Sequence, residues 1–152
     1  MPVTSSRRSS PSSQLPPIRC GAIIEQREGP FAIPGETHRP EYESITALGS
    51  LLMNDSLEAV IKANDICNRY GIDTISTGTA IAFAMECYEN GLITKEHTDG
   101  MALTWGNADA VVALTEKIAK REGFGAVLAD GPTIAAERIG RGSEQYAMAI
   151  RG

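Results

Sequence analysis

The sequence of 152 residues contains few cysteines and few aromatic residues. Its three cysteines, Cys20, Cys67 and Cys87, are widely spaced and form no C-x-x-C pair. An odd and scattered set does not predict a disulfide framework, and it suits a reducing compartment. Cys67 and Cys87 fall in helix-like segments, where we expect them to be buried as small apolar side chains. Spacing alone therefore reveals no complete metal site.

Long apolar runs and an excess of positive charge are also missing. No run approaches the ~18 residues that a membrane-spanning helix needs. The opening "MPVTSSRRSSPSSQ" lacks the apolar centre of a secretory signal peptide. The net charge of −5 argues against a general nucleic-acid binder, which usually has a basic surface. We therefore expect a cytoplasmic protein that has neither a membrane nor a nucleic acid as its partner.

The chain does contain enough apolar side chains for one folded domain, since hydrophobic residues make up 42% of it. Residues 1–15 are rich in Ser, Pro and Arg and cannot bury enough surface to offset their ordering entropy, so we expect them to be disordered. Residues 16–152 are expected to form the domain. Within it, residues 16–40 are rich in Pro and Gly and read as loop, with one short strand at "GAIIEQ".

After Pro40 the pattern becomes helical, which predicts a mainly α fold of about five helices. Asp55 is the expected N-cap of the second helix, because Glu58 follows it at the spacing of a capping box. Gly71 and Gly91 stand where glycines commonly end helices. The third helix is expected to begin at Asp73 or Ser76. The five helices are expected within residues 40–52, 55–71, 73–91, 107–123 and 132–140.

The segment "NDICNRYGIDTISTG" joins the second expected helix to the third. Gly71 ends one helix and Asp73 is placed to begin the next, with Asn68 one turn earlier. In one interpretation Asp73 is an N-cap and Asn68 faces solvent. In the other, Asn68 and Asp73 together grip a flat ligand that carries amino and amide groups, because a carboxylate accepts two such hydrogen bonds. Spacing leaves both interpretations open.

The remaining polar candidates have plainer explanations. His38 and His97 fall in polar turns and are expected to be solvated. Glu43 could serve acid–base chemistry, but a glutamate in a first helical turn also stabilises the helix dipole. Trp105 is better assigned to packing than to stacking on a base. No Ser-His-Asp arrangement can be placed.

Several quoted stretches nevertheless match a known family in order and spacing. They are "PIRCG", "EGPF", "RPEYES", "ANDICNRYGIDTISTG", "ENGLIT", "WGNADA", "REGFG", "LADG" and "AAERIGRGSEQYAM". Residues 16–152 resemble most of the second, helical domain of the tungsten-containing aldehyde ferredoxin oxidoreductases. The resemblance implies a tungsten (or molybdenum) atom held by two pterin dithiolenes, beside a four-iron four-sulfur cluster. It also implies oxidation of aldehydes to carboxylic acids, with electrons passed through the cluster to ferredoxin.

The resemblance assigns roles to individual residues. The family's pterin-binding motif D-x-x-G-L-D appears here as "NRYGID". Asn68 takes the place of the first aspartate, Gly71 and Asp73 match, and Ile72 replaces leucine. Glu43, in "PEYE", matches a glutamate near the metal and is therefore the implied catalytic residue.

The family's cluster ligands begin C-x-x-C-x-x-x-C, and the resemblance matches only one of them here. Cys20 takes the third position, whereas Ser13 and Pro16 stand at the first two. The fourth ligand would lie beyond Gly152. Proline has no donor atom for iron and serine is a poor substitute for thiolate. We therefore expect the isolated chain to hold neither cofactor completely and to be inactive.

Two other functions stay open beside that of an oxidoreductase fragment. The chain could be a non-catalytic helical remnant, or a subunit that completes a site together with other chains carrying the missing domains. It could also bind a partner through a basic arm at Arg7 and Arg8. The acidic remainder of the chain makes this arm the weakest of the three hypotheses.

Overall fold

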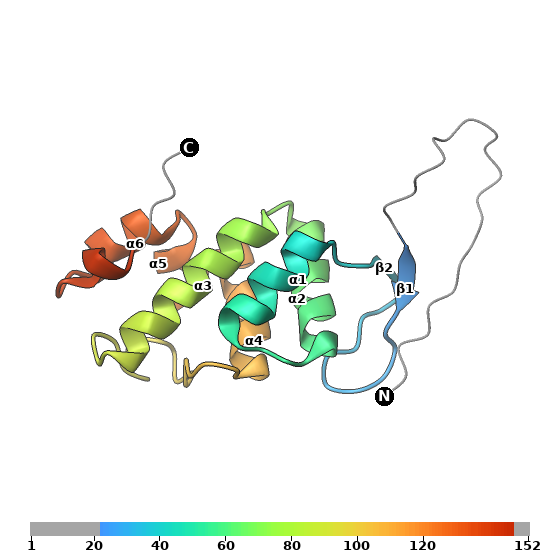
Figure 1. Ribbon diagram of the computed structural model, residues 1–152, viewed down its shortest axis with the longest axis horizontal. Coiled ribbons are helices and arrows are strands. Elements are labelled where there is room, and N and C mark those ends of the chain that lie inside the picture. Colours follow the sequence, from blue (N-terminus) through green and yellow to red (C-terminus); the bar gives the residue numbers. More distant parts are fainter. Residues whose placement is uncertain (1–21, 148–152) are drawn as a thin grey trace.

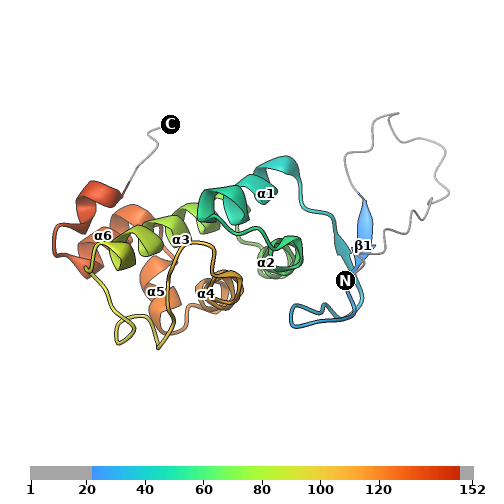
Figure 2. The same ribbon diagram turned by 60° about the horizontal axis from the view of Figure 1, so that its bottom comes forward.

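The computed structural model describes residues 22–147 as a helical domain with a small sheet at one end (Figures 1 and 2). The predicted mainly α class is confirmed. None of the helices in this range is long and apolar enough to cross a membrane. The elements are β1 (Ile23–Glu25), β2 (Glu36–His38), α1 (Tyr42–Leu48), η1 (Ser50–Leu52), α2 (Leu57–Tyr70), α3 (Thr74–Glu89), α4 (Ala108–Lys120), α5 (Phe124–Leu128), α6 (Pro132–Ile139) and η2 (Ser143–Tyr146).

The described residues contain six α-helices rather than the five expected. The additional helix is α5, which follows α4 after a break at Arg121, where the backbone turns left-handed with φ +53°. The first expected helix is also shorter than predicted, since α1 ends at Leu48 and a 3₁₀ turn follows. The N-cap of α2 is Ser56 and not Asp55, because the Ser56 hydroxyl accepts from the N–H of Ala59.

The Pro/Gly-rich segment forms two strands where one was expected. Strand β1 confirms the prediction at "GAIIEQ", and β2 pairs with it in antiparallel fashion, with Ile24 opposite Thr37. The sequence of β2 has no alternating apolar pattern, so local reasoning reads it as loop. Side chains of Ile24 and Ile33 pack with Ile61 of α2, which attaches the sheet to the helices.

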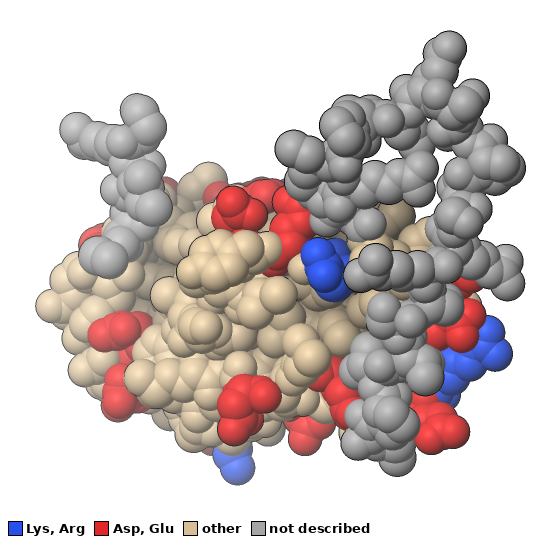
Figure 3. Space-filling model, turned by 45° about the vertical axis from the view of Figure 1, so that its right-hand side comes forward, with Lys and Arg blue, Asp and Glu red and all other residues tan. Residues whose placement is uncertain are grey.

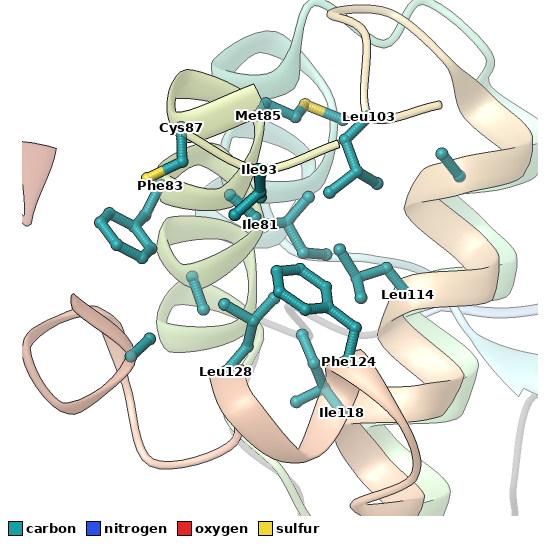
Figure 4. Packing of buried hydrophobic residues seen from close by; sticks show 14 of the residues in the cluster. Ile81, Phe83, Met85, Cys87, Ile93, Leu103, Leu114, Ile118, Phe124 and Leu128 are labelled. Carbon is teal, nitrogen blue, oxygen red and sulfur yellow. The ribbon is translucent and has the colours of Figure 1, made fainter. Parts of the chain in front are cut away.

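Helix α3 is the central element of the main core. Ile81 and Met85 of α3 are fully buried. In Figure 4 their side chains point toward Leu103 and Leu114, which belong to the same cluster. The short helix α5 adds Phe124 and further apolar side chains to the same cluster. Helix α3 buries side chains on nearly all sides, so several other elements pack around it.

The backbones of α1 and α3 lie in direct contact at one position. Gly78 of α3 is buried against Ala47 of α1, and a Cβ at Gly78 would overlap the Ala47 carbonyl group. In the views of Figures 1 and 2 the two helices lie side by side. Only glycine permits this approach, so Gly78 determines how closely α1 can pack.

We predict that Gly78→Ala destabilises the protein, although alanine is the better helix former by about 1 kcal/mol. The methyl group must displace the Ala47 carbonyl, and overpacking of this kind costs about 1–3 kcal/mol. Urea unfolding followed by circular dichroism measures the change. The control is Thr79→Ala, one residue further along α3, whose hydroxyl bonds only to the carbonyl of Ile75 in the same helix. A Gly78→Ala protein that is more stable than wild type would contradict the close contact.

Candidate functional site

Helix α2 ends in a turn whose shape requires glycine. Gly71 has φ +67°, a left-handed conformation that strains other residues. The N–H of Ile72 donates to the carbonyl of Cys67 at 3.0 Å, the hydrogen bond that closes a Schellman-type helix end. The half-buried Ile72 side chain packs against the main core. Gly71 and Ile72 therefore fix the direction in which the chain leaves α2.

Asp73 begins the next helix as its N-cap. Its Oδ2 accepts from the N–H of Ser76 at 2.7 Å, and its carbonyl oxygen accepts from the N–H and the hydroxyl of Thr77 at 3.1 and 2.7 Å. The capping interpretation of Asp73 is confirmed. Asp73 is also exposed, so its carboxylate remains accessible to a ligand. We call the turn from Asn68 to Asp73 the corner.

A pocket of about 220 Å³ opens beside the corner. Its walls come from the first turns of α3, the last turn of α4 and the segment after α5, and they mix apolar with polar groups. Of the four predicted pterin-binding residues, Ile72 and Asp73 line this pocket. Asn68 and Gly71 are exposed on the turn outside it. The lining residues are Ile72, Asp73, Ser76, Thr77, Ala80, Ile118, Ala119, Arg121, Leu128, Ala129 and Gly131.

Arg121 is a pocket residue that sequence reasoning did not identify. Its guanidinium donates to Asp130 Oδ1 at 2.9 Å, and Arg138 of α6 donates to the other oxygen at 2.7 Å. These hydrogen bonds, that of Arg121 first, hold the pKa of the Asp130 carboxyl below its ordinary value. A basic residue at the end of a helix usually complements the helix dipole, so the sequence gives no sign that Arg121, the residue after α4, lines a pocket.

Glu43 lies close to the corner although it is far from it in sequence. It is exposed in the first turn of α1, and the hydroxyl of the next residue, Ser44, is 2.8 Å from the hydroxyl of Thr74. Thr74 in turn follows Asp73. This contact places the first turn of α1, which carries the implied catalytic residue, against the first turn of α3, which follows the corner.

The described residues form no site for a metal cluster. Within residues 22–147 no three His, Cys, Asp or Glu side chains are grouped to hold a metal ion. Cys67 and Cys87 are free and buried as predicted, and burial raises the pKa of each thiol to about 11. Both thiols are therefore protonated core side chains. The predicted cluster ligand Cys20, with Ser13 and Pro16, lies outside the described residues.

The pocket wall formed by α5 depends on a long-range cap. The carboxylate of Asp99 accepts from the N–H of Phe124 at 2.7 Å, and Lys117 lies 3.3 Å away. The Phe124 hydrogen bond, with a smaller contribution from Lys117, lowers the pKa of Asp99. A Cβ at Gly123 would overlap this carboxylate, which explains the glycine before α5.

We predict that Asp99→Asn reduces stability at pH 7 and has no effect in acid. The substitution keeps a left-handed backbone and an acceptor oxygen and removes only the charge. Because the pKa of Asp99 is lower in the folded protein, its contribution is present above about pH 4 and is lost as the pH falls through the folded pKa. With a partly exposed side chain we expect a difference of about 0.5–1 kcal/mol at pH 7. Urea unfolding of both proteins between pH 2.5 and 7 measures it; a difference independent of pH would contradict the role of the charge.

The family model described as "Aldehyde ferredoxin oxidoreductase, domains 2 & 3" matches residues 8–152. The tungsten-containing aldehyde ferredoxin oxidoreductase of Pyrococcus furiosus is 46% identical over 125 residues, which cover 82% of this chain and 20% of that protein. The enzyme of the same name from Pyrococcus abyssi is 44% identical over 138 residues, which cover 89% of this chain and 22% of that protein. The chain thus spans about a fifth of the length of these relatives.

Two further relatives are parts of larger assemblies. The aliphatic sulfonate oxidoreductase, WOR-like subunit, of Pyrococcus furiosus is 32% identical over 140 residues, 90% of this chain and 22% of that protein. Among solved structures, the active site complex BamBC of benzoyl coenzyme A reductase with 1,5-dienoyl-CoA matches with a TM-score of 0.72 and 29% identity. That match covers 86% of this chain and 19% of the solved chain.

Proposed function

The chain belongs to the aldehyde ferredoxin oxidoreductase family, and we propose that it supplies the helical wall of a tungsten–pterin site in an aldehyde-oxidising enzyme. One observation carries this proposal: the motif "NRYGID" forms a rigid corner beside a pocket, with a carboxylate exposed at its edge. The reaction proposed for the whole enzyme converts aldehydes to carboxylic acids and delivers electrons to ferredoxin. We place it in the cytoplasm, where thiols stay reduced.

The residues of the corner fit a pterin ring. The edge of a pterin carries amino and amide groups that donate hydrogen bonds. The carboxylate of Asp73 can accept such bonds, and the side-chain amide of Asn68 can both accept and donate them. Ile72 and the apolar wall of the pocket offer a surface to the flat ring. The volume of about 220 Å³ is below the ~300–1,000 Å³ of pockets that enclose a whole drug-sized ligand. The pocket therefore suits one ring edge, and the rest of a bis-pterin group must be held by other polypeptide.

The bound tungsten–pterin group supplies the oxidation chemistry, and the protein supplies binding and orientation. Asp73 and Asn68 would hold the pterin edge, and Ile72 would exclude water from one face of it. Glu43, exposed in the helical turn that contacts the start of α3, is the group that would hold or accept a proton beside the substrate. The described residues do not fit an iron–sulfur cluster. Cys20 remains a proposed ligand, and no electron-transfer step is assigned to residues 22–147.

We further propose that this chain completes the site together with polypeptide outside its 152 residues. The matched segments make up only 20–22% of the relatives with a full activity in their name, and two of the matches are a subunit and a complex. The alternative of a non-catalytic helical remnant predicts no cofactor in any assembly. The two proposals therefore differ in a measurable property.

Anaerobic purification of the tagged chain from a host that makes the tungsten cofactor tests the proposal. We expect the co-purifying complex to contain pterin, measured by fluorescence after oxidation, and tungsten, measured by mass spectrometry. It should also reduce benzyl viologen when an aldehyde is added. The chain stripped of its partners should contain neither cofactor in full. A complex without pterin and without aldehyde-dependent reduction would favour the remnant.

Substitutions at Asp73 separate its capping role from ligand binding. Asp73→Ala removes the cap and should cost about 1 kcal/mol of stability, whereas Asp73→Asn keeps a capping oxygen and should be nearly neutral. Both lose a charge-assisted hydrogen bond to the pterin, so we expect the affinity for it to fall roughly tenfold to a hundredfold. Thermal unfolding and the pterin content of the complex measure the two effects. Full pterin retention in Asp73→Asn would exclude Asp73 as a pterin ligand.

A further inference from the structure

Glu43 lies at one end of a segment, residues 37–44, that is attached on both sides of the corner. On one side, the hydroxyl of Thr37 donates to Asp65 Oδ1 at 2.7 Å, and both residues are buried. The amide of Asn64 adds a longer hydrogen bond of 3.4 Å to the carbonyl of His38. Asp65 and Asn64 belong to the second half of α2, just before the corner.

On the other side of the corner, the segment is attached to α3. Ser44, buried in the first turn of α1, has its hydroxyl 2.8 Å from that of Thr74, the first residue of α3. One turn further along both helices, Ala47 and Gly78 make the backbone contact described above. Two successive contacts along the same pair of helices leave α1 little freedom to slide or rotate. The backbone of Glu43, directly before Ser44, is held by the same contacts, and its side chain is exposed.

The hydrogen bond from Thr37 to Asp65 uses a carboxyl group that is buried. Asp65 is 4% exposed, and the guanidinium nitrogen Nε of Arg69 lies 2.7 Å from its Oδ2 at an angle that forms no hydrogen bond. Arg69 also donates to the carbonyl of Pro34 at 3.3 Å. The Arg69 side chain is 47% exposed, so this ion pair is only partly desolvated and adds little to stability. Together with the hydrogen bonds from Arg69 to Pro34 and from Thr37 to Asp65, it ties residues 34–37 to α2.

We propose that Ser44 and Thr74, supported by the Thr37–Asp65 hydrogen bond, are positioning residues that hold Glu43 beside the cofactor corner. This inference rests on the proposed function, because it assigns them to the same site. Neither side chain of the Ser44–Thr74 pair is needed to bind the pterin. Their effect is on the placement of the Glu43 carboxylate relative to the edge that Asp73 holds. A displacement of about 1 Å of a reacting group can cost a hundredfold in rate.

Thr74→Val in the active complex is the first test. We expect kcat for aldehyde oxidation to fall roughly tenfold to a hundredfold, with KM, tungsten and pterin content unchanged. Thr74→Ser restores the hydroxyl and should restore kcat, and Ser44→Ala should reproduce the loss. Thr79→Val is the matched control, since it removes a hydroxyl from the same helix that contacts only its own backbone. A loss of kcat in Thr74→Val that follows a loss of pterin, or no loss at all, would overturn the positioning role.

A second measurement does not depend on activity. Backbone ¹⁵N relaxation of the 152-residue chain reports the order of residues 41–45 on the ps–ns timescale. We expect order parameters near 0.85 in the wild type and a drop below about 0.7 for these residues in Thr74→Val, with α6 unchanged. Thr37→Val should loosen residues 36–40 in the same way. Unchanged order in both variants would overturn the proposal, even in an active enzyme. Loosening in a chain whose complex shows no activity would instead reject the proposed function and retain the attachment.

Discussion

The close contact between α1 and α3 is the constraint from which the rest of the structure follows. Because Gly78 lets the Ala47 backbone approach, α1 lies along one side of α3 with its first turn beside the first turn of α3. The opposite sides of α3 then remain for α4 and α5, which close the main core. The turn that carries Glu43 lies beside the start of α3, next to the corner, as a consequence of this packing. A larger residue at position 78 would separate the two halves of the candidate site.

The sequence predicted the helices whose ends are determined by residues within a few positions of them. Gly71 and Asp73 correctly predicted the end of α2 and the start of α3, and the expected range 107–123 contains α4. Helix α5 was missed because its cap comes from Asp99, in a loop distant in sequence. Strand β2 was missed because it is held by pairing and by the Thr37–Asp65 hydrogen bond rather than by its own composition. Contacts between distant residues have no local signature.

The same distinction applies to the candidate site. Asp73 was identifiable from spacing as a cap and from the family resemblance as a ligand, whereas the pocket wall from α4 and residues 128–131 required the tertiary structure. Figure 3 shows that acidic side chains are spread over a largely uncharged face and that basic ones are few on its described part. Asn68 carries no charge and offers a donor as well as an acceptor oxygen, whereas the family motif has a carboxylate at this position.

The corner is shaped before any cofactor binds, because the chain itself satisfies the groups that define it. The N–H of Ile72 is paired with Cys67, and those of Ser76 and Thr77 are paired with Asp73. A ligand therefore does not have to order this turn, and the cost of binding falls accordingly. The same pairing limits what the corner can offer: these backbone donors are not available to a ligand. Under the proposed function, the side chains of Asn68 and Asp73 then supply the contacts that these three N–H groups cannot make.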